Sequence, residues 1–398
     1  MTCDVLVLGA GPAGISVSLL LARRGYSVEI LDPAFFPREK ICGEFLNPQA
    51  VGWLGDQGLS GALLSLDPYA VHGMKITDLR GRSFTGRYTN CKESSGYAVM
   101  RRSFDQLLVT QARNANIVIH EGWRAERLLF DGVGVCGVAG RDVENRRFDK
   151  RARILIGADG RNNLVGRTFG WIRGIRSLRK YAFQTYYEGV PALSHFGEVH
   201  MVRDGYVGIA PLNAQLANVA LVVDEKAFPG GDTDRMQFLQ SCIGASLLSE
   251  RFAGLKPAAP INSGGPLAFT STRASGHRTI LVGDTCGFID PFTGEGINYA
   301  FLSSNLAADV IHDAFQKGRF DDAELARYDR MRSEVFARKF MMARMLQRAI
   351  GSTRLAGYLV RKFAARLDLA DTVVSAVGSA VPVDRVWNLR FLLKLVFS

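Results

Sequence analysis

The stretch that decides the fold is Asp4–Leu8 (DVLVL), which is followed without a spacer by Gly9–Gly14 (GAGPAG). The short apolar run predicts a buried strand, and Ile15–Arg24 predicts a helix because its side chains are mostly apolar. Tyr26–Leu31 is a second apolar run, and it ends on Asp32. Strand, glycine turn, helix, strand and acid in this order predict the first βαβ unit of a dinucleotide-binding fold.

Each residue of the glycine turn has a physical task. Gly9 permits a tight turn, Gly11 lets the backbone approach a pyrophosphate, and Gly14 lets the helix pack closely on the strand. Pro12 and Ala13 complete the turn, and we count them with the glycines as cofactor-binding residues. Free N–H groups at the start of the helix face the phosphate charge.

Two stretches of the chain fit GxGxxG, but only the first has the right context. Asp32 lies eighteen residues after Gly14, where a carboxylate accepts hydrogen bonds from ribose hydroxyls and favours an unphosphorylated adenosine ribose. Gly132–Gly137 fits the same pattern, yet no helix-forming segment follows it and its alternating valines indicate a strand. The sequence therefore predicts one nucleotide-binding turn.

Length and composition are those of a globular protein with two or three domains. The chain has 398 residues, of which 47% are hydrophobic and 22% charged, and its formal net charge is +11. The basic excess is concentrated between Val335 and Arg366, where no acid accompanies the basic residues Arg338, Lys339, Arg344, Arg348, Arg354, Arg361, Lys362 and Arg366. Such a basic face suits an anionic lipid surface or nucleic acid, or is simply solvated.

The cysteines suggest neither a zinc site nor a disulfide framework. They form no CxxC pair, and none has metal-ligand spacing to a histidine, so we expect no metal: Cys3, Cys42, Cys91, Cys136, Cys242 and Cys286. Asp4–Leu8 is needed as a strand, so the start of the chain does not resemble a signal peptide, and no apolar run reaches about 18 residues. We therefore expect a cytoplasmic protein.

The resemblance to a known family rests on the loop after Asp32. Residues 37–44 read Pro-Arg-Glu-Lys-Ile-Cys-Gly-Glu, and this P-R-x-K-x-C-G-E pattern follows a GxGPAG turn and an acid. The combination resembles the geranylgeranyl reductase branch of the para-hydroxybenzoate hydroxylase superfamily of FAD enzymes, to which the flavin-dependent halogenases are also related. The resemblance implies FAD as the cofactor.

Later motifs extend the resemblance over most of the chain. Residues 101–108 are similar to the family's R-x-x-F-D-x-x-L helix, which implies Arg101 near the flavin; the alternative is a surface arginine that caps the helix. Residues 157–160 (GADG) and 283–287 (GDTCG) resemble the second and third fingerprints. The residues that the resemblance assigns to the cofactor in these and the following stretch are Arg101, Asp159, Gly160, Gly283, Asp284, Pro291, Gly294, Glu295, Gly296 and Ile297.

The resulting expectation is an α/β protein, α+β overall. A glutathione-reductase-type Rossmann FAD domain would comprise residues 1–75, 98–173 and 270–320. An inserted antiparallel β-sheet domain for the substrate would comprise residues 76–97 and 174–269, where the predicted strands are Tyr181–Tyr187, Gly197–Val202, Tyr206–Pro211 and Asn218–Val223. Residues 321–398 would form a C-terminal helical region.

Candidate catalytic residues lie in two loops. Gly294 and Gly296 would bring backbone N–H groups to the flavin, where the following helix dipole stabilises negative charge on the reduced ring. Lys40 and Cys42 border the active site in the family, and there they would tune or protonate the substrate; the alternative for Cys42 is a small buried side chain. NADPH or NADH would reduce the flavin, or another donor would serve.

Two reactions compete for the reduced flavin. Monooxygenation of a lipophilic small molecule, by hydroxylation or epoxidation, is favoured because Gly208 and Ala210 replace bulky aromatic residues of the reductase pattern and would widen the pocket wall. Reduction of a prenyl-chain double bond is the alternative. A halogenase is less favoured because its tryptophan-rich motif is missing, and a non-catalytic flavin redox sensor remains open.

The partners follow from charge and the apolar tail. Residues 387–397 combine apolar and basic side chains, so this end either lies on a membrane surface or docks on the protein. The expectation is a lipophilic substrate drawn through peripheral membrane contact at the basic C-terminal region. No motif for nucleic-acid binding is present, and no feature of the sequence indicates an oligomeric state.

Overall fold

A computed structural model of the chain describes residues 3–89, 93 and 95–397. Cys91 lies outside these residues. The helices are α1 (Pro12–Ala22), α2 (Pro48–Asp56), α3 (Ser60–Leu64), α4 (Arg101–Asn114), α5 (Leu164–Thr168), α6 (Arg235–Gly244), α7 (Gly296–Lys317), α8 (Asp322–Ile350), α9 (Thr353–Ala365), α10 (Leu367–Val377), α11 (Asp384–Trp387) and α12 (Leu389–Phe397). None of them is long and apolar enough to cross a membrane.

The nucleotide-binding sheet has a parallel core. Its main path runs in the order β19 (Ser275–Gly276), β20 (Thr279–Leu281), β11 (Arg147–Gly157), β1 (Cys3–Leu8), β2 (Val28–Asp32) and β8 (Val118–Glu121). The hairpin of β9 (Arg124–Phe130) and β10 (Val135–Arg141) extends from β11. Strand register aligns Leu8 with Gly157 and Gly157 with Leu281, so three glycine-rich stretches leave the sheet at one edge.

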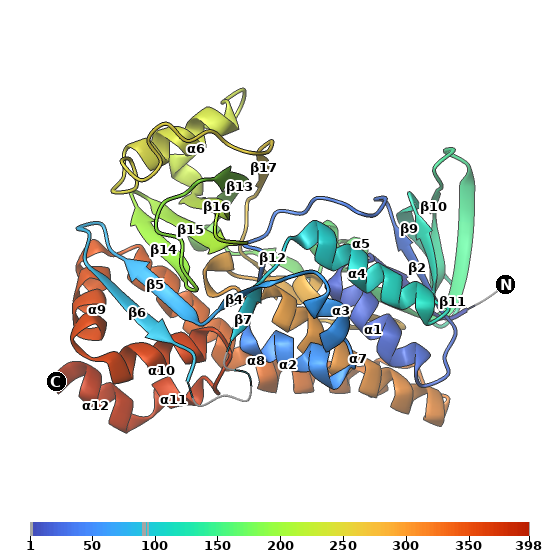
Figure 1. Cartoon of the computed structure of the whole chain (residues 1–398). Coiled ribbons are helices and arrows are strands. Elements are labelled where there is room, and N and C mark those ends of the chain that lie inside the picture. The colour runs from blue at the N-terminus through green and yellow to red at the C-terminus, as the bar shows by residue number, and fades with distance from the viewer. Residues whose placement is uncertain (1–2, 90–92, 94, 398) are drawn as a thin grey trace.

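A second sheet of seven strands stands beside the first (Figure 1). Its order is β17 (Asn262–Gly264), β13 (Lys180–Glu188), β16 (Leu216–Asp224), β15 (Gly205–Pro211), β14 (Gly197–Val202), β5 (Gly73–Thr77) and β6 (Ser83–Arg87). Smaller sheets are formed by β12 (Ile172–Gly174), β18 (Phe269–Ser271) and β21 (Gly287–Phe288), and by β3 (Phe45–Leu46), β7 (Gly96–Ala98) and β4 (Tyr69–Val71).

The seven-stranded sheet differs in one respect from the antiparallel sheet expected. Strands β5 and β14 pair in parallel, with Met74 opposite Gly197 and Thr77 opposite His200. The hairpin of β5 and β6 comes from the early part of the chain and joins the edge of a sheet whose other strands begin only at Lys180, so no tight turn fixes its direction. The domain boundaries drawn from the sequence stay a prediction.

Most element predictions are confirmed, with shifts at their ends. The first helix begins at Pro12 rather than Ile15 and ends at Ala22, because a proline is favoured at the first helical position. The second GxGxxG is a strand only from Val135, since the Asp131 carboxylate accepts the N–H groups of Val133 (2.8 Å) and Gly134 (3.0 Å) in a preceding turn.

The C-terminal helices pack against the β5–β6 hairpin (Figure 1). Phe84 of β6, Phe363 of α9 and Val374 of α10 belong to one buried cluster. The tail helix α12 joins it through buried Phe391, whereas Leu389 is 72% exposed. One side of the tail therefore docks on the protein, and the other faces outward.

Candidate active site

The nucleotide turn has room for no side chain at two of its glycines. Gly9 has φ +105°, and a Cβ there would lie 2.5 Å from the carbonyl oxygen of Ala158. A Cβ at Gly14 would lie 1.8 Å from the oxygen of Gly9. Gly11 differs, because the nearest atom to its added Cβ is a guanidinium nitrogen of Arg38 at 3.5 Å. The turn therefore presents an open backbone face next to a positive charge, which suits a pyrophosphate.

Asp32 ties the turn to the end of β2. Its Oδ2 accepts the N–H of Ala10 at 2.7 Å and its Oδ1 that of Ala34 at 2.8 Å. Nη1 of Arg38 donates to both oxygens at 3.2 Å. Sequence reasoning placed Arg38 in the family motif but assigned it no role, although a basic residue shortly after the ribose-binding acid was the signal available.

The second fingerprint meets the first at the sheet edge. Asp159 follows β11, and its Oδ2 accepts the N–H of Leu164 at 2.8 Å. Burial raises the pKa of Asp159 to about 6, and the charge of nearby Asp32 adds to that rise. Gly160 adopts φ +63° directly after it, so the backbone turns away from the open face.

Arg101 is buried, not a surface capping residue. It opens α4 and forms a bidentate pair with Asp105, with distances of 2.7 and 2.9 Å. Burial lowers the pKa of Arg101, but Asp105 and the Cys42 side chain outweigh that effect and the pKa is raised. Cys42 and Arg101 are therefore close neighbours.

Lys40 and Asp284 approach the same space from different stretches. Burial is the largest cause that lowers the pKa of Lys40, and the charges of Arg38 and Arg101 lower it further. The charge of Asp284 raises it. Burial raises the pKa of Asp284, against the effect of Lys40, Arg101 and Arg161. The loop after β2, the start of α4 and the turn after β20 thus bring their charges together.

The last glycine stretch closes this space. Gly283 has φ +63°, and its added Cβ would lie 2.7 Å from Cβ of Ala13 in the first turn. Gly296 lies beside Asp284, whose Oδ1 is 3.8 Å from an added Cβ. Gly294 also has φ +63° and packs on Phe45. The structure thus brings together the turns that the sequence assigned to FAD.

The side chains next to Gly294 and Gly296 differ in where they point. Pro291 begins a short helical turn, and Ile297 is buried in the first turn of α7. Glu295 is 2% exposed, and its carboxylate accepts Nζ of Lys339 at 2.8 Å and the hydroxyl of Tyr299 at 2.5 Å. The Glu295 side chain therefore binds helix α8 rather than the open face, which leaves only its backbone for a cofactor.

Glu44 is an acid that sequence reasoning quoted but assigned no role. It is 1% exposed, and its Oε1 accepts the hydroxyl of Tyr186 at 2.5 Å and the N–H of Arg101 at 3.3 Å. Its Oε2 has no hydrogen-bond partner among the described residues. Burial raises the pKa of Glu44 to about 7. A carboxyl group with that pKa, two residues after Cys42, is suited to hold and release a proton.

The seven-stranded sheet forms the opposite wall. Nδ2 of Asn218 donates to the carbonyl oxygen of Cys42 at 2.8 Å, which holds the loop against β16. Ala210 pairs with Asn218, and Gly208 pairs with Ala220 on the same face. Nothing lies nearer than 3.8 Å to a Cβ added at Gly208, so this part of the wall has open space in front of it.

An apolar hollow lies between this sheet and the C-terminal helices. Its interior volume is about 60 Å³, and the value rises to about 620 Å³ only when the space open to solvent is included. Only apolar side chains line it, from β5, β6, β14, α8, α9 and α10. Its lining also includes Phe292, two residues before Gly294. Sequence reasoning did not find the hollow, because its walls come from three distant parts of the chain.

Several buried polar atoms have no hydrogen-bond partner among the described residues. Those that we assign to the cofactor turns and the neighbouring walls, and not to the apolar hollow, are Arg38 Nε, Glu44 Oε2, Asp159 Oδ1, Gln184 Nε2, Asn218 Oδ1 and Asn298 Oδ1. Buried polar groups are nearly always paired. Together with the open face of Gly11, they fit a cofactor that carries a pyrophosphate and a polar ring.

Comparison with known proteins defines the class. The profile of the FAD binding domain family matches residues 2–343. The chain therefore belongs to the FAD binding domain family, and it is an FAD-dependent oxidoreductase.

Two relatives and one solved structure illustrate the range of this class. The chain is 28% identical over 356 residues to digeranylgeranylglycerophospholipid reductase 2 of Methanopyrus kandleri, covering 86% of this chain and 85% of that protein. It is 27% identical over 407 residues to menaquinone reductase of Mycobacterium tuberculosis, covering 98% and 94%. The myxobacterial chondrochloren halogenase CndH has the same fold, with a TM-score of 0.80, 22% identity and coverage of 94% and 92%.

Proposed function

We propose that this protein reduces a carbon–carbon double bond in the prenyl chain of a lipid, with NADPH or NADH as the reductant of its FAD. The observation that carries the proposal is the apolar hollow, which reaches Phe292 beside the turn at Gly294 and Gly296. A hollow without polar side chains provides no hydrogen bonds, so it suits a hydrocarbon chain and not a polar ring. Two relatives that span most of the chain are named as reductases, one of digeranylgeranylglycerophospholipid and the other of menaquinone.

The chain's own residues have distinct tasks in this reaction. Arg38 and the Gly11 face would hold the pyrophosphate, and Asp32 the ribose. Gly294 and Gly296 would hold the polar edge of the flavin, with the N-terminus of α7 favouring its reduced, anionic form. When bound, FAD supplies the hydride that one alkene carbon receives.

The other alkene carbon must receive a proton. Glu44 is protonated below about pH 7 and lies against Tyr186 and Arg101 next to the Cys42 loop. Protonated Glu44, directly or through the thiol of Cys42, would supply this proton and regain one from solvent after turnover. Together with the hydride, this proton would complete the two-electron reduction of the double bond, and NADPH or NADH would supply the two electrons.

Monooxygenation is the competing reaction, and product mass separates the two. Purified FAD-loaded protein is incubated with NADPH and either a geranylgeranyl glycerolipid or a prenylated quinone, once in air and once without oxygen. We expect a product that is heavier by two hydrogens and forms at least as well without oxygen. A product heavier by one oxygen atom, formed only in air, would replace this proposal with a monooxygenase.

Cys42→Ala tests the contribution of the loop. If the thiol relays the proton, the variant keeps its flavin absorbance spectrum but loses about tenfold or more of its turnover. Unchanged turnover would mean that Cys42 is only a small side chain in the wall of the site.

A further inference from the structure

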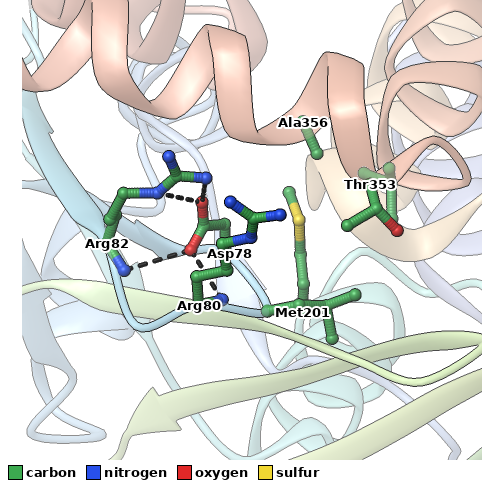
Figure 2. A pocket seen from close by; sticks show the side chains of 8 residues that line it. Asp78, Arg80, Arg82, Met201, Thr353 and Ala356 are labelled. Carbon is green, nitrogen blue, oxygen red and sulfur yellow. Dashed lines mark hydrogen bonds and ion pairs between the residues drawn. The ribbon is translucent and has the colours of Figure 1, made fainter.

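Beside the apolar hollow lies a smaller space with a more polar lining, which we call the vestibule. Figure 2 shows Asp78, Arg80 and Arg82 of the turn between β5 and β6 facing Thr353 and Ala356 of α9 across a small space. Met201, Ile350 and Ala356 line both this vestibule and the hollow. The two spaces are therefore neighbours that share part of their lining.

The turn between β5 and β6 is held firmly beside α9. Oδ1 of Asp78 accepts the backbone N–H groups of Arg80 and Arg82, and its Oδ2 accepts Nε of Arg82 at 2.8 Å. The guanidinium packs over Gly357, where an added Cβ would lie 2.4 Å from Nη2. Asp78 is thus neutralised by Arg82, and the position of the vestibule is fixed by packing.

Exposed leucines surround the vestibule. Leu79, in the same turn, is 40% exposed, and Leu355, next to Ala356, is 45% exposed. Leu247 is 61% exposed and lies against the same turn, because its Cδ1 is 3.5 Å from a Cβ added at Gly81. Three large apolar side chains from separate segments that face water around one opening are unusual for a surface that only contacts solvent.

Two arginines give this opening its charge. Arg80 and Arg354 are exposed, and neither forms an ion pair with any residue that the structure describes. In contrast, several residues of the basic run are already occupied: Arg338 pairs with Asp384, Lys339 with Glu295, and Arg366 with Asp368. Arg80 and Arg354 therefore place unpaired charge beside the exposed leucines, while Arg344, Arg348 and Arg361 are further exposed arginines of the run without an ion pair among the described residues.

We propose that this rim, defined as Leu79, Arg80, Leu247, Arg354 and Leu355, docks on an anionic lipid bilayer. The leucines would enter the interface while the two arginines meet lipid phosphates, an arrangement typical of peripheral membrane proteins. A prenyl chain would then pass from the bilayer through the vestibule into the hollow without crossing water. The passage of a prenyl chain rests on the proposed function, whereas the docking of the rim on the bilayer does not.

Vesicle flotation of the full-length, FAD-loaded protein tests the docking. The vesicles are phosphatidylcholine with or without phosphatidylglycerol, and no substrate or reductant is added. The parent protein should float with the anionic vesicles and much less with the neutral ones. The double variant Arg80→Glu/Arg354→Glu should lose about tenfold or more of the bound fraction. Its control, Arg124→Glu/Arg127→Glu, changes the net charge equally on β9, at the far end of the molecule (Figure 1), and should bind like the parent.

An apolar set of variants tests the leucines separately. Leu79→Ser/Leu247→Ser/Leu355→Ser should weaken flotation, whereas Val118→Ser/Val133→Ser/Val143→Ser, which changes exposed valines near the β9–β10 hairpin, should not. A parent that does not float, rim variants that float like the parent, or equal losses in the controls would overturn the inference.

Turnover assays distinguish this inference from the proposed function. Rim variants should lose much more turnover with a vesicle-embedded lipid than with a lipid dispersed in detergent. If the parent floats and the rim variants do not, while no lipid is reduced in either form, docking stands and the proposed reaction fails.

Discussion

The cofactor side of the active site and the apolar hollow are built on opposite principles. The cofactor side is made of glycines without space for a Cβ and of buried charges with fixed partners, such as Arg101 with Asp105. The hollow is made of apolar side chains from six elements and leaves space unfilled. A ligand of constant shape is recognised by exact backbone fit, whereas a hydrocarbon chain is only enclosed. Substitutions on the two sides should therefore fail in different ways.

The largest effect is expected at Gly14 on the cofactor side, where there is no space for a side chain. Gly14→Val places side-chain atoms where the carbonyl oxygen of Gly9 already lies within 1.8 Å of an added Cβ. We expect loss of FAD and of soluble protein, measured by flavin absorbance and yield. Gly61→Ala is the matched control, because nothing lies within 4 Å of its added Cβ. A folded Gly14→Val protein with bound FAD would show that the turn is not rigid.

The next effect should arise where the two sides meet. Lys339→Met leaves the Glu295 carboxylate buried without its cation, a change that typically costs about 3–5 kcal/mol of unfolding free energy. Thermal unfolding of the FAD-loaded protein measures the loss. Adding Glu295→Gln removes the stranded charge and should restore part of the stability. No recovery in the double variant would mean that Lys339 acts through packing alone.

Glu44→Gln tests the cofactor side of the site through the pH dependence of turnover. The pKa of Glu44, about 7, is above its ordinary value of 4.5, so the protonated form persists in the folded protein and is lost as pH rises through 7. Parent turnover should fall over the same range, and the variant should lose about a hundredfold at pH 6 with a flattened profile. The stabilising effect of neutral Glu44 on the fold should likewise decline between about pH 4.5 and 7. An unchanged pH profile in the variant would exclude Glu44 as the proton donor.

The smallest effect is expected in the hollow. Leu346→Trp fills part of it from α8, and we expect kcat/KM for a long prenyl chain to fall about tenfold while FAD binding is unchanged. Met341→Trp adds the same bulk at a 44%-exposed position of the same helix and should have no effect. Equal activity of both variants would place the substrate chain elsewhere.

The same contrast explains how far the sequence could predict the structure. Gly9, Gly14 and Gly283 are required by local backbone geometry, so short motifs reveal them. Their convergence follows from strand register, which aligns Leu8, Gly157 and Leu281. The family resemblance implied Arg101 near the flavin and Cys42 at the border of the active site, but not the contact between the two residues.

Other parts of the site depend on contacts between distant segments. The hydrogen bond of Glu44 with Tyr186 joins residues 142 positions apart, and the pair of Glu295 with Lys339 joins residues 44 apart. The hollow depends on how α8, α9 and α10 pack against β5 and β14, and apolar side chains that line a space have the same periodicity as those that fill a core. The sequence pattern therefore predicts burial there but not the space.

The contacts of Glu295 also affect how the protein is made. Its partners Lys339 and Ser379 come 44 and 84 residues later in the chain, and Ser379 also donates to its carboxylate. While the ribosome is still synthesising residues 340–379, the turn that would hold the flavin ring carries a carboxylate whose partners have not all emerged. The contacts that fix this turn are therefore completed late in synthesis, after most of the chain has been made.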